Sequence, residues 1–238
     1  MKSLIFILLF TTNVFANDFL QFSDYGIKAG AIYGGPIPTK SLSNLDASPL
    51  LAPNLGIYYN YQFSENISLH SELTFTMKGA SFNTSYRRDT LAETEIEGQK
   101  GTVPTFYTAL INGDMSVIYL EIPIFFSYDI SEDIKMSIGV QPSFIIGGKN
   151  DINARVIVGE GGFYDDIKRY YDNMRFLNFF DFALCLGGFY NISETFSIGL
   201  YGSRAITPLY KDSFKTDPSL ETGKMYNTQI TGSLYYRL

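Results

Sequence analysis

Apolar and polar residues alternate one by one over long stretches of this chain. In the segment 54–63, Leu55 and Ile57 fall on one side and Asn54 on the other. Successive side chains of a β-strand point to opposite faces, so a period of two predicts a strand with one apolar and one polar face. The pattern predicts strands at about 24–33, 54–63, 67–78, 116–128, 134–147, 177–190, 195–206 and 226–238.

The connections between these strands alternate between short and long. The short ones at 64–66, 129–133 and 191–194 each contain Ser-Glu followed by Asn, Asp or Thr. Such side chains satisfy the free amides of a tight turn. The long ones are predicted at about 34–53, 79–115, 148–176 and 207–225. Short turns at one end and long loops at the other are typical of an up-and-down barrel in an outer membrane.

Two of the long connections carry features of their own. We expect the loop at 79–115, which contains Tyr86-Arg87-Arg88-Asp89 and Glu93–Glu97, to extend its flanking strands beyond a membrane. The segment Phe163–Asp172 mixes charges with aromatic residues and is expected to form a solvated loop that packs on the barrel rim. The alternative is a short amphipathic helix that would suit a protein contact.

Alternation alone does not separate a soluble barrel from a membrane barrel, because the two differ in which face points outward. The predicted strands run to 10–14 residues, enough to cross a bilayer when tilted. Their polar faces carry few charges: Lys28, Glu72, Lys78, Glu121, Lys135, Asp181 and Arg237. We therefore predict an all-β fold, a closed antiparallel up-and-down transmembrane β-barrel of about eight strands. The residues then expected to face lipid include Leu73, Phe75, Ile138 and Ile230.

Tyrosines cluster near the predicted strand ends, where the aromatic girdles of membrane barrels lie. They are Tyr25, Tyr33, Tyr58, Tyr59, Tyr61, Tyr128, Tyr190, Tyr201, Tyr235 and Tyr236. The final strand places Leu234, Tyr236 and Leu238 on one face. Because a free strand edge cannot exist in lipid, this strand is expected to pair with the first and close the barrel.

The N-terminus and the composition bear on location. Lys2, the apolar run Leu4–Phe10 and Val14-Phe15-Ala16 predict a secretory signal peptide at residues 1–16, with the barrel domain at 17–238. Cys185 is the only cysteine, so no intramolecular disulfide can form. The formal charge of −6 argues against nucleic acid as a partner. The expected partners are outer-membrane lipid and a protein bound through the long extracellular loops; the oligomeric state stays open.

Several motifs resemble a known family. Tyr119-Leu120-Glu121-Ile122-Pro123 looks like the signature of the PorT-like outer-membrane β-barrel family, which is typical of Bacteroidota. Similar to that family's first, sixth and closing strands are Gly26–Gly30, Asp181-Phe182 with Gly187–Tyr190, and Tyr235–Leu238. The resemblance implies a barrel in the outer membrane; a minority of the family is linked to protein secretion or gliding.

The candidate chemistry is sparse. His70 is the single histidine and is expected in the lumen beside Ser68 and Glu72, as a hydrogen-bonded residue rather than the base of a lipid hydrolase. Eight strands enclose a space just wide enough for side chains. We therefore expect the carboxylates to pair with the cations inside the barrel. The expected partners are Glu72, Glu121 and Asp181 on one side and Lys28, Lys135 and Arg237 on the other. The alternative is a narrow, gated ion pathway.

Cys185 is expected to fill space on the lumen side. We expect no catalytic residue, no cofactor and no metal site. The sequence thus favours a non-enzymatic outer-membrane barrel with a structural or partner-binding role, accessory to secretion if the resemblance extends to function. Two alternatives stay open: a lipid-modifying or proteolytic outer-membrane enzyme, and a soluble, secreted lipocalin-like barrel that binds an apolar ligand.

Overall fold

The computed structural model describes residues 23–38, 47–96, 99–160, 163–171, 174, 177–211 and 225–238. Ten strands form a single antiparallel sheet. They are β1 Ser23–Pro38, β2 Ala47–Ser64, β3 Ile67–Ile96, β4 Gln99–Glu121, β5 Ile124–Asp129, β6 Ile134–Glu160, β7 Phe163–Tyr171, β8 Phe180–Asn191, β9 Phe196–Ala205 and β10 Met225–Arg237. In the described part of the chain, no helix is long and apolar enough to span a membrane. The predicted signal peptide lies outside the described residues.

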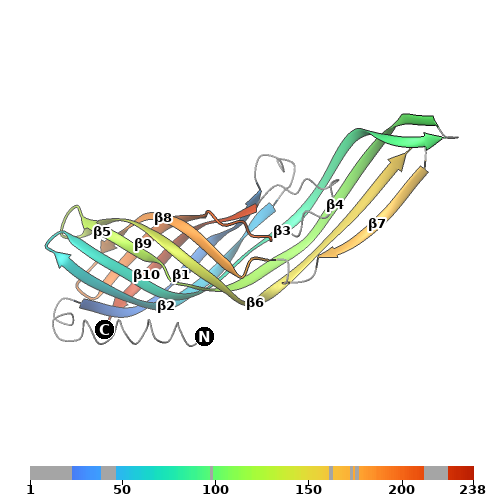
Figure 1. The fold of residues 1–238 in the computed structure, drawn as a ribbon. Helices are drawn as coiled ribbons and strands as arrows, with labels where there is room; N and C mark the ends of the chain where they lie inside the picture. The colour runs from blue at the N-terminus through green and yellow to red at the C-terminus, as the bar shows by residue number, and fades with distance from the viewer. Residues whose placement is uncertain are drawn as a thin grey trace, which may run out of the picture.

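The sheet closes on itself (Figure 1). Its order is β2-β1-β10-β9-β8-β6-β4-β3-β5, and β2 also pairs with β3, which completes the ring. β4 and β5 together occupy one position in the barrel, interrupted at Ile122 and Pro123, because proline has no N–H to donate to a neighbouring strand. The barrel therefore has the eight strand positions that the alternation predicts. β7 lies outside it.

The three short turns lie where the sequence predicts them, and the serines of two of them act as expected. The Ser131 hydroxyl accepts a hydrogen bond from the Ile134 amide at 3.2 Å, and the Ser193 hydroxyl accepts one from the Phe196 amide at 3.1 Å. The last strand ends beside one of these turns and pairs with β1 over Gly26 to Pro38, which confirms the predicted closure.

Apolar side chains cover the outside of the barrel. Leu73, Phe75, Ile138 and Ile230 are 38%, 55%, 65% and 56% exposed. Their polar neighbours along each strand, such as Glu72 and Ser137, are buried. The outward direction of the apolar residues excludes the lipocalin-like carrier, which needs them inside.

The tyrosine prediction is confirmed only in part. Tyr25, Tyr33, Tyr128, Tyr190 and Tyr236 are exposed on the outer surface near strand ends. Tyr201 and Tyr235, in contrast, are buried in the lumen. They lie on the polar face of their strands, so a position near a strand end does not by itself predict that a tyrosine points outward.

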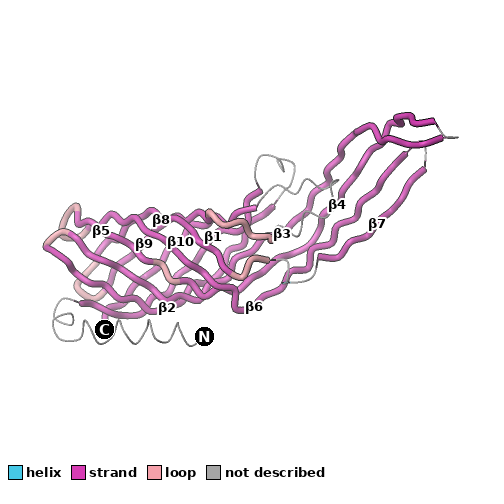
Figure 2. Tube along the Cα trace, viewed as in Figure 1, coloured by secondary structure: helices cyan, strands magenta, loops and turns pink. Residues whose placement is uncertain are grey.

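Three barrel strands continue far beyond the barrel, and β7 joins them (Figure 1 and Figure 2). β3 and β4 stay paired out to Ile96 and Gln99, β4 pairs with β6 as far as Glu160, and β6 pairs with β7. The expectation that 79–115 extends its flanking strands is confirmed. We call the outer part of these strands the projecting sheet. It comprises β3 after residue 83, β4 before residue 112, β6 after residue 151 and all of β7.

The solvated loop expected at 163–172 is wrong, as is the alternative helix, because residues 163–171 form β7. Its neighbour is the stretch of β6 from Ile152 to Glu160, which contains Val156, Ile157 and Val158. β-branched residues favour an extended backbone, and pairing with this preformed strand outweighs the weak helical pattern.

A local irregularity lies where the barrel passes into the projecting sheet. Opposite Ile118 and Tyr119 of β4, the register of β6 skips Ile146, which forms a β-bulge. Gly148 follows with φ of +135°, and a Cβ there would lie 2.5 Å from the Ser116 carbonyl oxygen. Bulges bend a strand and increase its twist, so this glycine lets the sheet turn away from the barrel wall.

Candidate functional site

The lumen contains two clusters of buried polar residues, arranged one above the other along the barrel axis. Polar residues occupy alternate positions on the barrel strands, and the inward positions point at one another because the barrel is narrow. We name the two sets after their central residues. The Glu72 cluster comprises Lys28, His70, Glu72, Tyr201 and Tyr235; the Lys78 cluster comprises Lys78, Tyr119, Glu121, Gln141, Asp181 and Asn227.

Glu72 of β3 is the acceptor at the centre of the first cluster. The Lys28 ammonium of β1 donates to Glu72 Oε2 at 2.5 Å, and the Tyr235 hydroxyl of β10 donates to Oε1 at 2.6 Å. His70 Nε2 lies 3.0 Å from Oε1. A buried carboxylate is costly unless it is paired and hydrogen-bonded. These contacts satisfy that requirement and tie three strands together across the lumen.

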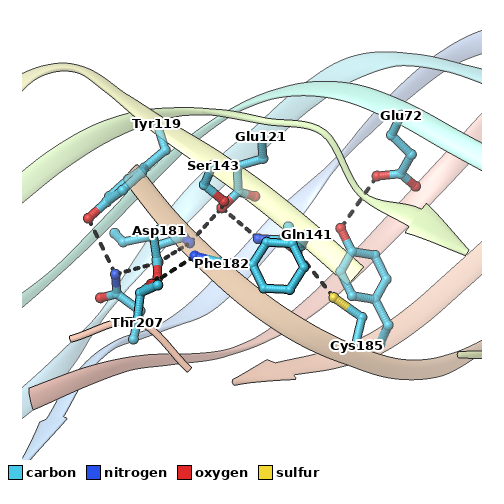
Figure 3. Close-up of polar contacts among 12 residues, drawn as sticks. Glu72, Tyr119, Glu121, Gln141, Ser143, Asp181, Phe182, Cys185 and Thr207 are labelled. Atoms are coloured by element: carbon cyan, nitrogen blue, oxygen red, sulfur yellow. Dashed lines mark hydrogen bonds and ion pairs between the residues drawn. The ribbon is translucent and has the colours of Figure 1, made fainter. Parts of the chain in front are cut away.

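The second cluster lies further along β3 toward the projecting sheet, and Figure 3 shows its Tyr119, Glu121, Gln141 and Asp181. The Lys78 ammonium is 2.6 Å from Glu121 Oε1 and 3.6 Å from Asp181 Oδ2. Gln141 Nε2 donates to Glu121 at 2.7 Å. One cation thus serves two carboxylates.

Neutral donors complete the surroundings of Asp181. Asn227 Nδ2 donates to Oδ2 at 2.8 Å, and the Thr207 hydroxyl donates to Oδ1 at 2.8 Å. Charge-assisted hydrogen bonds of this kind are stronger than neutral ones. They therefore help to stabilise Asp181, which shares the Lys78 ammonium with Glu121.

Aromatic and aliphatic side chains fill the space that the polar clusters leave. Phe125, Phe189, Tyr201 and Tyr235 pack together with Cys185 at the Glu72 cluster. At the other end, Leu177 and Leu209 pack on the cluster that contains Met115 and Val117. Leu177 and Leu209 come from the segments that follow β7 and β9, and a bridge between Leu177 and Tyr210 joins these segments. The lumen is therefore covered by chain segments where it meets the projecting sheet.

The predicted ion pairing is partly right. Lys28 pairs with Glu72, as expected. Lys135 and Arg237 instead pair with Asp129 and Asp24 at the short-turn end. Glu121 and Asp181 share Lys78, whose role as their partner the sequence did not indicate because the three residues lie on different strands.

The residues considered for catalysis lie buried in the lumen, where His70 contacts Glu72. His70 stacks on Tyr58 with ring centroids 5.5 Å apart and lies 4.6 Å from Phe189. The Ser68 hydroxyl makes no hydrogen bond to it and is buried. Cys185 is buried, and its thiol lies 3.6 Å from Gln141 Oε1, as expected for a space-filling residue. Within the described residues, no group of three or more His, Cys, Asp and Glu side chains could hold a metal ion.

A cavity of about 150 Å³ opens at the short-turn end. Its lining includes the turn residues Ser193 and Thr195, the Asp24–Arg237 ion pair, and His70 at the edge of the Glu72 cluster. No pattern in the sequence indicates this cavity, since its residues are brought together only by barrel closure.

A comparison with protein families agrees with this architecture. A family model described as outer membrane protein beta-barrel domain matches residues 15–211. Ail, the attachment invasion locus protein of Yersinia pestis, is 12% identical in sequence, with 91% of this chain and 99% of Ail covered and a TM-score of 0.43. Neisserial surface protein A is 10% identical, with 90% and 97% covered and a TM-score of 0.42.

OprG from Pseudomonas aeruginosa is 11% identical, with 90% and 95% covered and a TM-score of 0.38. A comparison with curated proteins finds no matching sequence.

Proposed function

We propose that this protein is a non-enzymatic membrane anchor that presents a partner-binding sheet outside the cell. The chain belongs to the outer membrane protein beta-barrel domain family. The protein is an integral β-barrel of the outer membrane. Barrels of this type have short turns in the periplasm and long loops outside. By that rule, the turns at 65–66, 130–133 and 192–195 are periplasmic and the projecting sheet is extracellular.

One observation carries the proposal: the strands that enclose a filled lumen also build the projecting sheet. The Glu72 and Lys78 clusters occupy the interior of the barrel with paired charges and packed rings. A lumen filled in this way supports anchoring rather than conduction. Outside the membrane, β3, β4, β6 and β7 form a sheet whose two outer strands each have one paired side.

Free strand edges favour a protein partner. An edge strand presents unpaired backbone N–H and C=O groups that an additional strand can use. The edges here belong to β7 and to the outer part of β3, each of which is hydrogen-bonded to one neighbour among the described strands. We therefore place partner binding on the projecting sheet rather than in the barrel.

The two other functional readings have less support. A Ser–His hydrolase needs the hydroxyl within hydrogen-bonding reach of the histidine, whereas His70 contacts Glu72. An accessory role in secretion would follow from the resemblance to the PorT-like family. However, Tyr119 and Glu121 of that motif contact Asn227 and Lys78 inside the lumen, so the motif supports the fold rather than a secretion role.

Surface labelling tests the presentation of the sheet. Thr102 at the tip of β4 and Ser193 in a short turn are both exposed, so Thr102→Cys and Ser193→Cys form a matched pair in a Cys185→Ser background. On intact cells, a membrane-impermeant maleimide is expected to label Thr102→Cys, and Ser193→Cys only after permeabilisation. Labelling of Ser193→Cys alone on intact cells contradicts the orientation.

Conductance tests the filled lumen. The purified full-length chain, reconstituted in a planar bilayer, is expected to give no discrete conductance steps. Regular steps from wild-type protein would contradict the anchor and favour the gated ion pathway.

A further inference from the structure

β7 is the open edge of the projecting sheet. It pairs with β6 in antiparallel register from Ile152↔Tyr171 to Glu160↔Phe163 and with no other described strand. The backbone groups on its far side pair with no strand in the described part of the chain, so a further strand could use them.

The sequence of β7 reverses its charge about a central residue. The strand reads Phe163-Tyr164-Asp165-Asp166-Ile167-Lys168-Arg169-Tyr170-Tyr171. Two acidic residues precede Ile167 and two basic residues follow it, with aromatic residues at both ends. When a second copy of this strand is laid antiparallel about Ile167, every acidic position meets a basic one.

The strand that β7 already contacts does not match this pattern. The register with β6 places Val158 opposite Asp165, Ile157 opposite Asp166 and Ala154 opposite Arg169. Lys168 is opposite Arg155, and like charges directly opposite one another are unfavourable. In this register, therefore, no charged position of β7 is directly opposite a position of opposite charge on β6.

We propose that β7 pairs with β7 of a second copy of this chain, in antiparallel register about a two-fold axis at Ile167. This inference rests on the proposed function and names its partner. Asp165 then lies opposite Arg169 of the other copy, and Asp166 opposite Lys168. Opposite charges and aromatic residues that face each other across two strands stabilise the pairing. The interface uses the same surface on both copies, as a two-fold dimer requires.

The direction of pairing determines where the second barrel lies. Antiparallel β7 strands place the two projecting sheets side by side with opposite directions, so that they form one continuous sheet. Because each projecting sheet leads away from its barrel (Figure 1), the two barrels lie at opposite ends of this sheet. The two copies are therefore carried by two membranes that face each other, and the contact joins cells or vesicles.

The length of the strands limits the gap that such a contact can span. Ile167 is opposite Val156, which is eight residues beyond Gly148 at the bend (156 − 148). At roughly 3.4 Å per residue, the two-fold axis lies about 27 Å from the bend of each copy, so the two bends would be about 55 Å apart. The paired ends of β3 and β4 extend further from the barrel than this axis and would reach the level of the opposite bend.

Disulfide trapping tests the register. Right-side-out outer-membrane vesicles are prepared from two strains that express the full chain with different epitope tags, both in a Cys185→Ser background. In Ile167→Cys, the two cysteines lie directly opposite, with Cα atoms about 4.5–5.5 Å apart, a distance that a disulfide can bridge. In the matched control Asp165→Cys, they are offset by four residues, roughly 13 Å. We expect mixed-tag dimers from Ile167→Cys and at least tenfold fewer from Asp165→Cys.

Charge reversal tests the complementarity. Vesicles with Asp165→Lys and Asp166→Lys carry an all-basic β7, and vesicles with Lys168→Asp and Arg169→Asp carry an all-acidic one. Neither population should cluster alone, and the mixture should cluster like wild type in two-colour fluorescence. Heat-modifiable migration on gels confirms that each barrel is folded.

The outcomes separate this inference from the proposed function. If Thr102→Cys is labelled on intact cells but Ile167→Cys gives no mixed-tag dimer, the self-pairing is wrong and the presented sheet stands. Dimers that form only within one vesicle population, or through Asp89→Cys on the edge of β3, would also overturn it. If Thr102→Cys is not labelled on intact cells, the proposed function itself fails.

Discussion

Replacing Lys78 by methionine removes the only cation that contacts Glu121 and Asp181 within the described residues. Its ammonium lies 2.6 Å from Glu121 Oε1 and 3.6 Å from Asp181 Oδ2, and the side chain is almost fully buried. Methionine has a similar length and keeps the packing on the Tyr119 ring, over which the ammonium lies at 4.6 Å. The substitution therefore tests charge rather than volume.

The expected loss in free energy of unfolding follows from the two carboxylates that remain buried in Lys78→Met. Removing one partner of a buried ion pair costs about 3–5 kcal/mol, because the remaining charge stays buried without compensation. The donors to Asp181 from Asn227 and Thr207 are retained, which places the expected loss within that range rather than above it. The triple variant Lys78→Met, Glu121→Gln, Asp181→Asn leaves no unpaired buried charge and should recover most of the loss.

Equilibrium unfolding in urea, with the protein in lipid vesicles and the folded fraction read from heat-modifiable migration, measures these differences. Lys149→Met is the matched control, because Lys149 pairs with Asp151 on the exposed surface, and it should leave the free energy of unfolding unchanged. Equal stability of Lys78→Met and Lys149→Met would contradict this expectation, and so would a triple variant that is as unstable as Lys78→Met.

Three further predictions follow from the same structure. Ile138→Arg places a cation on the lipid-facing side of β6 and should cost about 2–4 kcal/mol in urea unfolding if the residue lies near the bilayer midplane; an unchanged midpoint would contradict its outward direction. Gly30→Val should abolish the heat-modifiable folded form, because a Cβ at Gly30 would lie 2.1 Å from the Gly232 carbonyl oxygen at the β1–β10 closure; a folded variant would show that the strands can separate there. His70→Ala should keep the folded barrel and the vesicle clustering while lowering stability by about 1–3 kcal/mol, because Glu72 loses one partner; loss of clustering in a folded variant would contradict a purely structural role.

The alternation along the chain predicted the barrel because period two survives in every strand that has lipid on one side. Phe125 and Phe126 illustrate this: they are adjacent and chemically identical, yet one is buried in the lumen and the other is exposed. The position in the repeat, rather than the residue type, decides the direction. The short turns were also predictable, since their serines act locally.

What the sequence did not predict depends on contacts between distant segments. Lys78 meets Asp181 only after β3, β4, β6 and β8 have curled into a ring. Segment 163–172 carries spacing compatible with a helix, and only the presence of β6 beside it selects a strand. Leu177, which the alternation places at the start of a strand, and Leu209, which it places in a loop, both lie outside the strands and cover the lumen.

Tryptophan fluorescence tests directly whether the apolar side chains of the barrel strands point outward to lipid. The chain contains no tryptophan, so Phe126→Trp and Phe125→Trp each introduce a single fluorophore at nearly the same membrane depth. In vesicles of lipids with brominated acyl chains, the fluorescence of Phe126→Trp should be strongly quenched and that of Phe125→Trp should be largely retained. Strong quenching of Phe125→Trp with none of Phe126→Trp would contradict the account.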